Sequence, residues 1–540
     1  MGRRGSPTPW SYFFVRLLFK FVLKIFYGSI VVENANWIPE NGEPCIVVAN
    51  HSNSLTDALL IVTSIPGAKR NLIRLTAKAT QFGKRTFTSW LIESAGTVPI
   101  KRAKDSPEGK VDNNDVFVKL MEALEQGDAV LLFPEGMSRY HPTIAPLKTG
   151  VARIVSDVLS RNKNEPQFKI SILTCSITYM HREHFRSDVL ITFHPPLSFT
   201  PQSNPELIAP VDFTHIRSLT SRIRNEISSG TIDSPSWDIV RSAKLASRIY
   251  APLGTAMSLG DYVRICRIFV EVFKWAEDEK KESIPPSSRS EEEDEQSATE
   301  KAKSVNLLRQ NLKIYQDELS NLGIKDDRIR RPIPRRTILR RIFVRAAWML
   351  FLCIISFPGL ILWLPIFASA QYGARKYSQK GPVWDTWDEI AQHKLVFGLI
   401  SGICVWLTCI LVTLPMAPVT ATVVPLVMWM TLRWLEDAVS AGRAFVALTK
   451  LLWVGKRTLH RMYEQRMDLH TRIMLLAVDY LGLPNNPETV FAESGGREKG
   501  RVRGPWERRA KYFSLRRRRK RDWNETLRLY DKVNYPELEH

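Results

Sequence analysis

Apolar and polar positions follow different periods in different parts of the chain. Between residues 34 and 230, short apolar runs of strand length alternate with segments whose apolar positions recur every three to four residues, as on one helix face. This alternation predicts an α/β fold with a mostly parallel sheet flanked by helices. The predicted strands are residues 45–49, 128–133, 169–177 and 189–193, and the clearest predicted helices are residues 115–126 and 150–159.

The first apolar stretch, residues 10–32, is interrupted by Arg16, Lys20 and Lys24. A spacing of four residues places these cations along one stripe of a helix, with aromatic and aliphatic side chains around the rest. Such a helix suits a membrane interface, and an ordinary amphipathic helix packed on the domain is the alternative. The favoured prediction is a membrane-interface helix.

Beyond the α/β domain the chain changes character. Residues 342–370 and 395–415 are long and apolar enough to cross a bilayer, and residues 419–435 are a third candidate that prolines interrupt. Basic residues before the first stretch and in the C-terminal tail place both flanks in the cytosol by the positive-inside rule. Both flanks lie on one side only if the number of crossings is even, which favours a two-helix hairpin.

The predicted organisation has seven parts. They are an interface helix at 1–33, the α/β domain at 34–230, a helical extension at 231–281, an acidic disordered linker at 282–303, a helical and basic juxtamembrane segment at 304–341, a transmembrane hairpin with a third candidate span at 342–435, and a helical and basic tail at 436–540.

The charge composition predicts an anionic binding partner. The chain has 76 Lys and Arg against 55 Asp and Glu, a net charge of +21, which suits nucleic acid, an anionic membrane surface or phosphorylated substrates. Beside membrane spans, a lipid contact or a solvated charge run is favoured for the basic tail, and no nucleic-acid partner is expected. The six cysteines lack the spacing of a metal or redox pair. His181 and His184 have no further ligand at suitable spacing, so no metal is predicted.

Four motifs carry candidate chemistry. His51 and Asp57 follow the strand at 45–49, at the kind of sheet edge where open α/β sheets bind ligands. A neutral imidazole can take a proton from an attacking hydroxyl, while a carboxylate fixes its tautomer and stabilises the imidazolium. Alone, such a pair more often serves structure. The other motifs are residues 96–102, which end in adjacent cations, residues 133–136, which follow a buried strand, and the strand ending at Ile177.

The order and spacing of these motifs resemble the phospholipid/glycerol acyltransferase family. The resemblance implies that His51 is the general base and Asp57 its partner, and that Arg102 binds phosphate. It further implies a substrate-binding role for residues of the first three motifs and their surroundings. These are Asn50, Asn53, Lys78, Gly96, Arg102, Glu135, Gly136, Ser138, Arg139 and Lys148.

The motifs also depart from the family pattern. Five residues separate His51 from Asp57 instead of the usual four, and on a continuous helix the extra residue would rotate Asp57 by about 100°. The pair therefore works only if the turn absorbs the extra residue. Residues 137–139 are Met-Ser-Arg where Thr-Arg-Ser is usual. The longer spacing and residues 179–187 resemble the fungal-type glycerol-3-phosphate/dihydroxyacetone-phosphate acyltransferases.

This resemblance implies acyl transfer from acyl-CoA, as co-substrate, to the sn-1 hydroxyl of glycerol 3-phosphate or to dihydroxyacetone phosphate. It implies no cofactor, and an endoplasmic reticulum membrane protein whose catalytic domain and tail are cytosolic. A lysophosphatidate acyltransferase is the alternative within the enzyme class. An inactive membrane scaffold, with the stretched His–Asp spacing as a sign of decay, is the alternative outside it. The sequence leaves acyl-chain preference and oligomeric state open.

Overall fold

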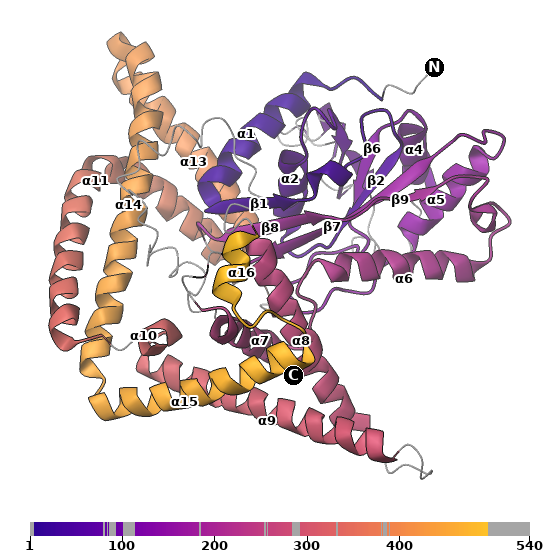
Figure 1. Ribbon diagram of the computed structural model, residues 1–540. Coiled ribbons are helices and arrows are strands. Elements are labelled where there is room, and N and C mark those ends of the chain that lie inside the picture. The colour runs from indigo at the N-terminus through magenta and orange to yellow at the C-terminus, as the bar shows by residue number, and fades with distance from the viewer. Residues whose placement is uncertain are drawn as a thin grey trace. The chain divides into compact units, whose positions relative to one another are not determined.

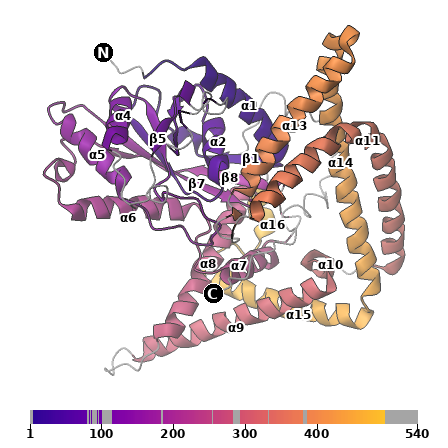
Figure 2. The same ribbon diagram turned by 180° about the vertical axis from the view of Figure 1, so that it is seen from behind.

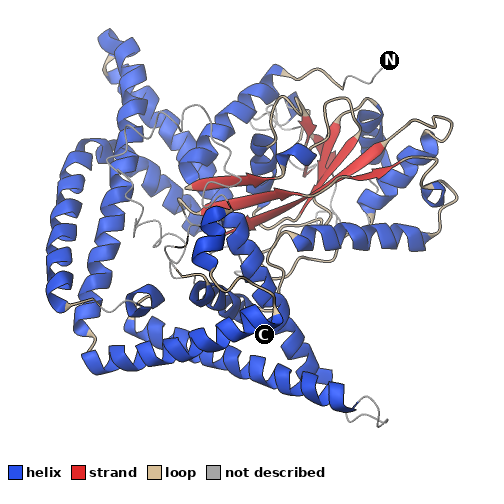
Figure 3. Ribbon diagram, viewed as in Figure 1, coloured by secondary structure: helices blue, strands red, loops and turns tan. Residues whose placement is uncertain are grey.

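The computed structural model divides the chain into two compact units (Figure 1). The first comprises residues 1–231 and 374–395, and the second comprises residues 232–373 and 396–499. The sheet lies in the first unit, and the regular elements described for the second are helices (Figure 3). The structure describes residues 5–78, 82–83, 85, 93–94, 96–100, 114–182, 185–252, 255, 257–282, 292–330, 333–379, 381, 386–387 and 389–494.

The first unit is built on a seven-stranded sheet with the order β1-β8-β7-β2-β6-β3, in which β9 also pairs with β7. Four of its pairings are parallel, and only β7–β8 and β7–β9 are antiparallel. The mostly parallel α/β fold predicted from the sequence is therefore confirmed. The strands are β1 (Ser29–Glu33), β2 (Cys45–Ala49), β3 (Ile73–Arg74), β6 (Ala129–Leu132), β7 (Ile170–Tyr179), β8 (Asp188–Phe193) and β9 (Leu197–Phe199), while β4 (Thr76–Lys78) and β5 (Val98–Ile100) form a separate parallel pair.

Helices cover the sheet because each strand presents alternate side chains to opposite faces. Ile46 and Val48 of β2 share one core with the apolar stripes of α4, α5 and α6, which lie together beside the sheet in both views (Figure 2). The helices of this unit are α1 (Trp10–Phe26), α2 (Ser54–Ser64), α4 (Asn114–Glu125), α5 (Gly150–Arg161) and α6 (Phe213–Ser229).

The N-terminal segment corrects one prediction. The helix expected over residues 10–32 ends at Phe26, and residues 29–33 are strand β1, paired in parallel with β8. Gly28 makes the transition, because a Cβ there would lie 2.6 Å from the carbonyl oxygen of Arg186. The β-branched residues that follow favour a strand over a helix. The sheet domain therefore begins at β1, before residue 34.

Helix α1 has two different faces. Tyr12, Leu23 and Phe26 are buried, while Trp10 and Phe13 are 77% and 60% exposed. The guanidinium of Arg16 donates to the backbone carbonyls of Ile65 and Arg70, so this cation is tied to the domain. The helix is thus packed on the domain and still presents an aromatic face outward.

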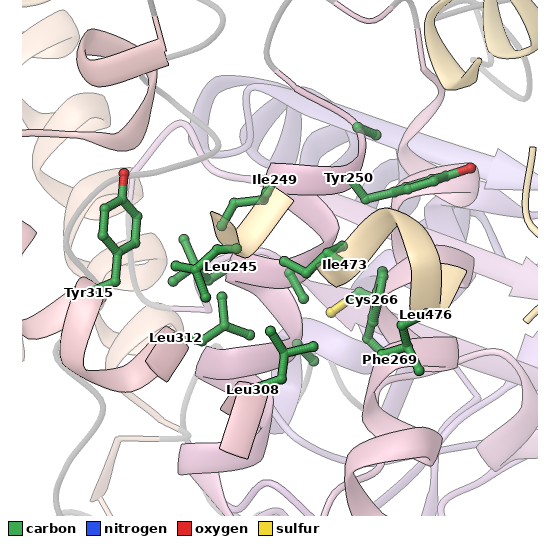
Figure 4. Close-up of a cluster of buried hydrophobic side chains, with 14 of the residues drawn as sticks. Leu245, Ile249, Tyr250, Cys266, Phe269, Leu308, Leu312, Tyr315, Ile473 and Leu476 are labelled. Carbon is green, nitrogen blue, oxygen red and sulfur yellow. The ribbon is translucent and has the colours of Figure 1, made fainter. Parts of the chain in front are cut away.

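The second unit has its own apolar core (Figure 4). Leu245 and Ile249, Cys266 and Phe269, Leu308 and Leu312, and Ile473 and Leu476 meet there from four segments of the chain. The helices outside the membrane candidates are α7 (Trp237–Tyr250), α8 (Leu259–Glu282), α9 (Glu292–Leu322), α10 (Asp326–Arg330), α15 (Lys456–Leu475) and α16 (Pro487–Glu493), with a π-turn at Leu476–Tyr480.

The acidic segment is also corrected. Residues 282–303 were predicted to be disordered, but α9 begins at Glu292 and α8 ends at Glu282. Ala302, within the segment predicted to be disordered, continues the helical spacing of Val305 and Leu308, and all three are buried. Packing of this stripe on the core stabilises the helix that composition alone argued against. Residues 283–291 lie outside the described part of the chain.

Three helices are long and apolar enough to cross a membrane: α11 (Arg335–Ser378), α13 (Ile390–Val412) and α14 (Ala417–Trp453), which a short turn at Leu414–Met416 precedes. The third candidate of the sequence is therefore a long helix, in spite of Pro425 within it. The number of crossings stays a prediction. The basic run at 516–521 lies outside the described residues.

Candidate active site

His51 and Asp57 come together at the carboxyl end of β2. His51 lies two residues beyond the strand, and Asp57 lies in the first turn of α2. His51 Nδ1 is 2.9 Å from Asp57 Oδ2, with the two side chains 18% and 0% exposed. The imidazole is stacked on the ring of Phe133, with ring centroids 4.1 Å apart. A hydrogen bond at Nδ1 leaves Nε2 as the nitrogen that can exchange a proton with a substrate.

The turn between the two residues absorbs the extra residue of the motif. Ser54, the first residue of α2, has a φ of +44°, an uncommon conformation for a residue other than glycine. Asp57 Oδ2 accepts hydrogen bonds from the backbone N–H groups of Ser52 and Asn53 at 2.8 and 2.7 Å. These bonds close the turn over the carboxylate, and the rotation expected for a continuous helix does not occur.

A tyrosine that the sequence did not single out completes the carboxylate's environment. The hydroxyl of Tyr179, at the end of β7, donates a 2.5 Å hydrogen bond to Asp57 Oδ1. Burial, followed by the adjacent Asp57, raises the pKa of Tyr179 well above its ordinary value. Tyr179 therefore stays protonated and remains a donor. Both carboxylate oxygens of Asp57 are thus held, which fixes the orientation of His51.

Glu135 joins the first and third motifs. Its Oε1 accepts from the backbone N–H of His51 at 2.6 Å, and its Oε2 accepts from the backbone N–H of Ala145 at 3.1 Å. Burial raises the pKa of Glu135, while these two hydrogen bonds act in the opposite direction. The side chain therefore holds the loop after β6 against the residue that carries the imidazole.

The two asparagines of the first motif are held from other strands. Asn50 donates to the carbonyl of Ile177 at 2.9 Å and accepts from its N–H at 2.7 Å, which joins the ends of β2 and β7. Asn53 is fully buried, and its amide donates to the hydroxyl of Tyr27 at 3.2 Å. The structure shows both side chains positioning the loop, and their predicted substrate contacts stay predictions.

The loop after β6 brings cations near His51. The N–H of Arg139 bonds to the carbonyl of His51 at 3.4 Å, and the side chains of Arg139 and Lys148 are exposed. Gly136 has a φ of +76°, and a Cβ there would lie 2.5 Å from Lys148 Nζ. Ser138 is half-buried in the same loop. Exposed cations on a loop that is bonded to the backbone of His51 can meet a phosphate group.

The second motif lies partly outside the described residues. Gly96, with a φ of +75°, precedes β5, which pairs with β4 and places Lys78 opposite Ile100. Arg102 and the side chain of Lys78 are not among the described residues. Their predicted phosphate and substrate contacts therefore stay predictions.

Arg182 is a second residue that the sequence did not assign. Its guanidinium donates to the carbonyls of Ser52, Arg139 and His141 at 3.1 to 3.4 Å, and it lies 4.8 Å from the ring centroid of Tyr140. It therefore ties the first motif to the third. Its place three residues after β7, within the segment 179–187 that resembles the fungal-type enzymes, was the available signal.

The site provides a proton acceptor, and the two cysteines described in the neighbouring strands are not activated as nucleophiles. Cys45 and Cys175 are buried in β2 and β7, and burial raises the pKa of both thiols, that of Cys45 to about 11. Protonated thiols are poor nucleophiles. Over the described ranges, no group of three His, Cys, Asp or Glu residues could hold a metal ion. The geometry suits general-base activation of a substrate hydroxyl.

Comparison with known proteins gives two matched regions. Residues 29–178 match the Acyltransferase family, and residues 296–381 match the Glycerol-3-phosphate acyltransferase 2 C-terminal domain. The resemblance predicted from the four motifs is therefore confirmed, and the region that matches the Acyltransferase family lies in the first unit. The second match covers α9, α10 and α11.

Three curated relatives are fungal. Glycerol-3-phosphate O-acyltransferases 2 and 1 of Saccharomyces cerevisiae are 24% and 22% identical over 55% and 54% of this chain, and the alignments cover 38% and 36% of those proteins. An uncharacterized acyltransferase of Schizosaccharomyces pombe is 23% identical over 64% of this chain and 49% of its own length. The chain thus spans less than half the length of the curated relatives it matches.

Among solved structures, the 1-acyl-sn-glycerophosphate acyltransferase PlsC from Thermotoga maritima is similar over 40% of this chain and 78% of that chain, with 18% identity and a TM-score of 0.28.

Proposed function

We propose that this chain, with its acyltransferase domain at residues 29–178, transfers a fatty acyl group from acyl-CoA to the sn-1 hydroxyl of glycerol 3-phosphate, forming lysophosphatidate. The observation that carries the proposal is the 2.9 Å contact between His51 and a fully buried Asp57 at the carboxyl end of β2. The similarity to two yeast glycerol-3-phosphate O-acyltransferases supports this acceptor.

In the proposed reaction, His51 Nε2 takes the proton of the acceptor hydroxyl as its oxygen attacks the thioester carbonyl. The carbon–sulfur bond then breaks, the new ester forms, and the imidazolium returns the proton to the departing CoA thiolate. Asp57 stabilises the imidazolium between these two steps. The chemistry requires no metal or cofactor, and acyl-CoA is a co-substrate.

The phosphate of the acceptor would lie beside the loop that carries Arg139 and Lys148. Both side chains are exposed, and the loop is fixed to His51 through Glu135 and a backbone bond of Arg139. Arg102, assigned from the family resemblance, is the other proposed phosphate ligand. Charge-assisted hydrogen bonds from these cations would orient the hydroxyl toward the imidazole.

The proposed setting is the endoplasmic reticulum membrane, with the acyltransferase domain and the tail in the cytosol. Three candidate membrane helices and the exposed aromatic face of α1 support an association with lipid. A bilayer beside the site would deliver the acyl chain of the donor and receive the product.

The test is acyl transfer from labelled acyl-CoA by the purified chain, with glycerol 3-phosphate, dihydroxyacetone phosphate and lysophosphatidate offered separately. We expect lysophosphatidate from glycerol 3-phosphate, and a loss of at least ~10²-fold in His51→Ala that still folds. His215→Ala, on the surface helix α6, is the matched control. Turnover of lysophosphatidate alone would change the assigned acceptor. Inactivity with all three acceptors would favour the scaffold alternative.

A further inference from the structure

The first part of α11 runs antiparallel to α14. Trp363 Nε1 donates a 2.9 Å hydrogen bond to the carbonyl of Met428. Earlier in α11, the sulfur of Met349 packs against Gly442, where an added Cβ would lie 3.0 Å from it. As residue numbers rise along α11, its partners therefore move toward the beginning of α14.

The second part of α11 runs antiparallel to α13 instead. Ser369 Oγ donates a 2.7 Å hydrogen bond to Ser401 Oγ, and the rings of Tyr377 and His393 lie 4.2 Å apart. As residue numbers rise further along α11, its partners move toward the beginning of α13. Because α13 and α14 are joined by a short turn, the first part of α11 runs toward that junction and the second part runs away from it.

These contacts give α11 a turning point. Helices α13 and α14 are joined by a tip at Leu414–Met416 and contact each other through Trp406 and the carbonyl of Ala421. At 1.5 Å per residue, Gly442 on α14 lies about 39 Å from the tip and Met428 lies about 18 Å from it. His393, the last of these contacts on α13, lies about 30 Å from the tip. Two prolines inside α11, Pro358 and Pro365, provide the bend, which Figures 1 and 2 both show.

Between its mapped contacts, each part of α11 rises by less than the thickness of a bilayer. From Met349 to Trp363, and again from Trp363 to Tyr377, the helix rises about 21 Å, whereas a bilayer's hydrocarbon core is about 30 Å thick. The apolar length of the whole helix would suffice for one crossing, but its contacts first approach the tip between α13 and α14 and then recede from it.

The packing of the residues after the bend supports the same path of α11. Residues 374–395, which follow the bend, belong to the same compact unit as the acyltransferase domain. The ring of Trp387 lies 5.2 Å from that of Tyr140. The residues that precede α11 follow the acyltransferase domain without a candidate span, within the described parts of 232–334. The C-terminal end of α11, from Ala374 to Ser378, therefore belongs to the unit that carries the catalytic domain.

Gln392 connects this returning segment to the helix that carries Asp57. Its Oε1 accepts from Ser54 Oγ at 3.1 Å and from the N–H of Leu55 at 3.3 Å, at the N-terminus of α2. The N-cap residue Asn53 makes no side-chain capping bond there. Gln392 thus satisfies a backbone donor that a helix start leaves open.

We propose that α11 is a re-entrant membrane helix, bent at Pro358 and Pro365, which returns residues 374–395 to the acyltransferase domain, where Gln392 positions α2 and hence Asp57. The bilayer is the partner of α11, and the catalytic side is the only aqueous side that its ends reach. The positioning role of Gln392 rests on the proposed acyltransferase function, whereas the path of α11 does not.

Chemical labelling tests the path without any assay of activity. Gly381→Cys lies just beyond α11, Met416→Cys lies at the tip between α13 and α14, and Ser203→Cys marks the catalytic domain; all three positions are exposed. Each full-length variant in sealed vesicles is treated with a membrane-impermeant maleimide before and after detergent, with the parent chain as the background for native cysteines.

The two topologies give opposite patterns. A re-entrant α11 makes Gly381→Cys react in parallel with Ser203→Cys, while Met416→Cys is protected until detergent is added. A single crossing by α11 would place Gly381→Cys on the side opposite Ser203→Cys and bring Met416→Cys back to the side of Ser203→Cys. That second pattern would overturn the proposal.

Kinetics test the role of Gln392. Gln392→Leu removes the acceptor, and we expect kcat to fall about tenfold with KM for glycerol 3-phosphate little changed, as for a loss of transition-state alignment. Gln392→Glu retains an acceptor oxygen and should recover most of kcat. Gln379→Leu, at an exposed glutamine of the same segment, is the control. Equal rates for Gln392→Leu and Gln379→Leu would refute the positioning role, while inactivity of the parent would instead refute the proposed function and leave the labelling result standing.

Discussion

Asp57→Asn isolates the charge of the carboxylate from its geometry. The amide oxygen can occupy the place of Oδ2, which accepts from His51 Nδ1 and from the N–H groups of Ser52 and Asn53. The amide nitrogen then faces the hydroxyl of Tyr179, which can accept instead of donating. The hydrogen-bond pattern and the tautomer of His51 are therefore retained, and the negative charge is lost.

The size of the effect follows from the contact distance. With Nδ1 and Oδ2 2.9 Å apart, the charges of an imidazolium and a carboxylate are centred about 4 Å apart. At an effective dielectric constant of about 20, their attraction is about 4 kcal/mol. Because the imidazolium forms only as the hydroxyl is deprotonated, this energy appears in the barrier, and its loss corresponds to about 10³-fold in kcat.

The assay is acyl transfer to glycerol 3-phosphate at saturating acyl-CoA, beside thermal unfolding of each variant. We expect kcat to fall about 10³-fold, with a loss of about 1–2 kcal/mol in stability from weaker hydrogen bonds to a neutral acceptor. Asp212→Asn, at the exposed start of α6, is the control for a change at another helix-start aspartate. A folded Asp57→Asn that retains more than a tenth of the parent's kcat would refute the reasoning, because no barrier of this size could then depend on the charge.

Four further changes have expected outcomes. Tyr179→Phe removes a donor from a buried carboxylate and should lower the unfolding free energy by about 1.5–3 kcal/mol, measured by denaturant titration. Gly136→Ala should cost about 1–2 kcal/mol by the same titration, because its φ is +76°. Because the pKa of Glu135 is raised above its ordinary value of 4.5 in the folded protein, its protonation stabilises the fold fully below pH 4.5, and this contribution is lost as pH rises through the folded pKa. Any advantage in melting temperature of the parent over Glu135→Gln should therefore shrink above pH 4.5. Arg466→Leu leaves Asp326 buried without its 2.9 Å partner and should lower the stability of the second unit by about 3–5 kcal/mol, measured by calorimetry.

The sheet was predictable where local pattern and burial agree. Strand β2 (Cys45–Ala49) is buried along its whole length and pairs on both sides, so a short apolar run identified it without knowledge of its partners. Strand β1 was missed because α1 and β1 form one apolar stretch, and hydrophobicity does not mark where a helix ends. Gly28 and the run Ile30–Val32 were the local signals that could have separated them.

Helix α9 shows the limit of composition. Its first turns are rich in acidic residues, which is typical of a solvated linker. The contacts that hold it come from α8, where Asn306 Nδ2 donates to the carbonyl of Ala276 at 2.5 Å and Arg309 pairs with Glu277 at 2.7 Å. A local pattern contains no information about such a partner helix.

The candidate site also contains residues that the sequence could pair and residues that it could not. His51 and Asp57 are six positions apart and could be paired from a motif, although the strained turn at Ser54 that permits the pairing could not. Tyr179 reaches Asp57 from 122 positions away, and Gln392 reaches Ser54 from 338 positions away. Residues that position a catalytic group from other elements are determined by tertiary packing, and a single sequence gives no direct signal for it.

The turn that precedes α2 is held by contacts from two other segments, one at the end of α1 and one at the start of α13. The guanidinium of Arg186, a residue with a φ of +64°, donates to the carbonyls of Lys24, Ile25 and Tyr27 and so holds the end of α1. The hydroxyl of Tyr27 then accepts from Asn53, which lies directly before α2.

From the other direction, Gln392 at the start of α13 binds the first residues of α2. The turn that orients Asp57 is thus fixed from both sides by segments whose neighbours present apolar surfaces, on α1 and on α13. A helix start held at two such points cannot rotate without disturbing one of them. If both segments rest on lipid, the orientation of His51 depends on the bilayer, and Arg186→Ala and Gln392→Leu should lose activity by the same route: a lower kcat at nearly constant KM.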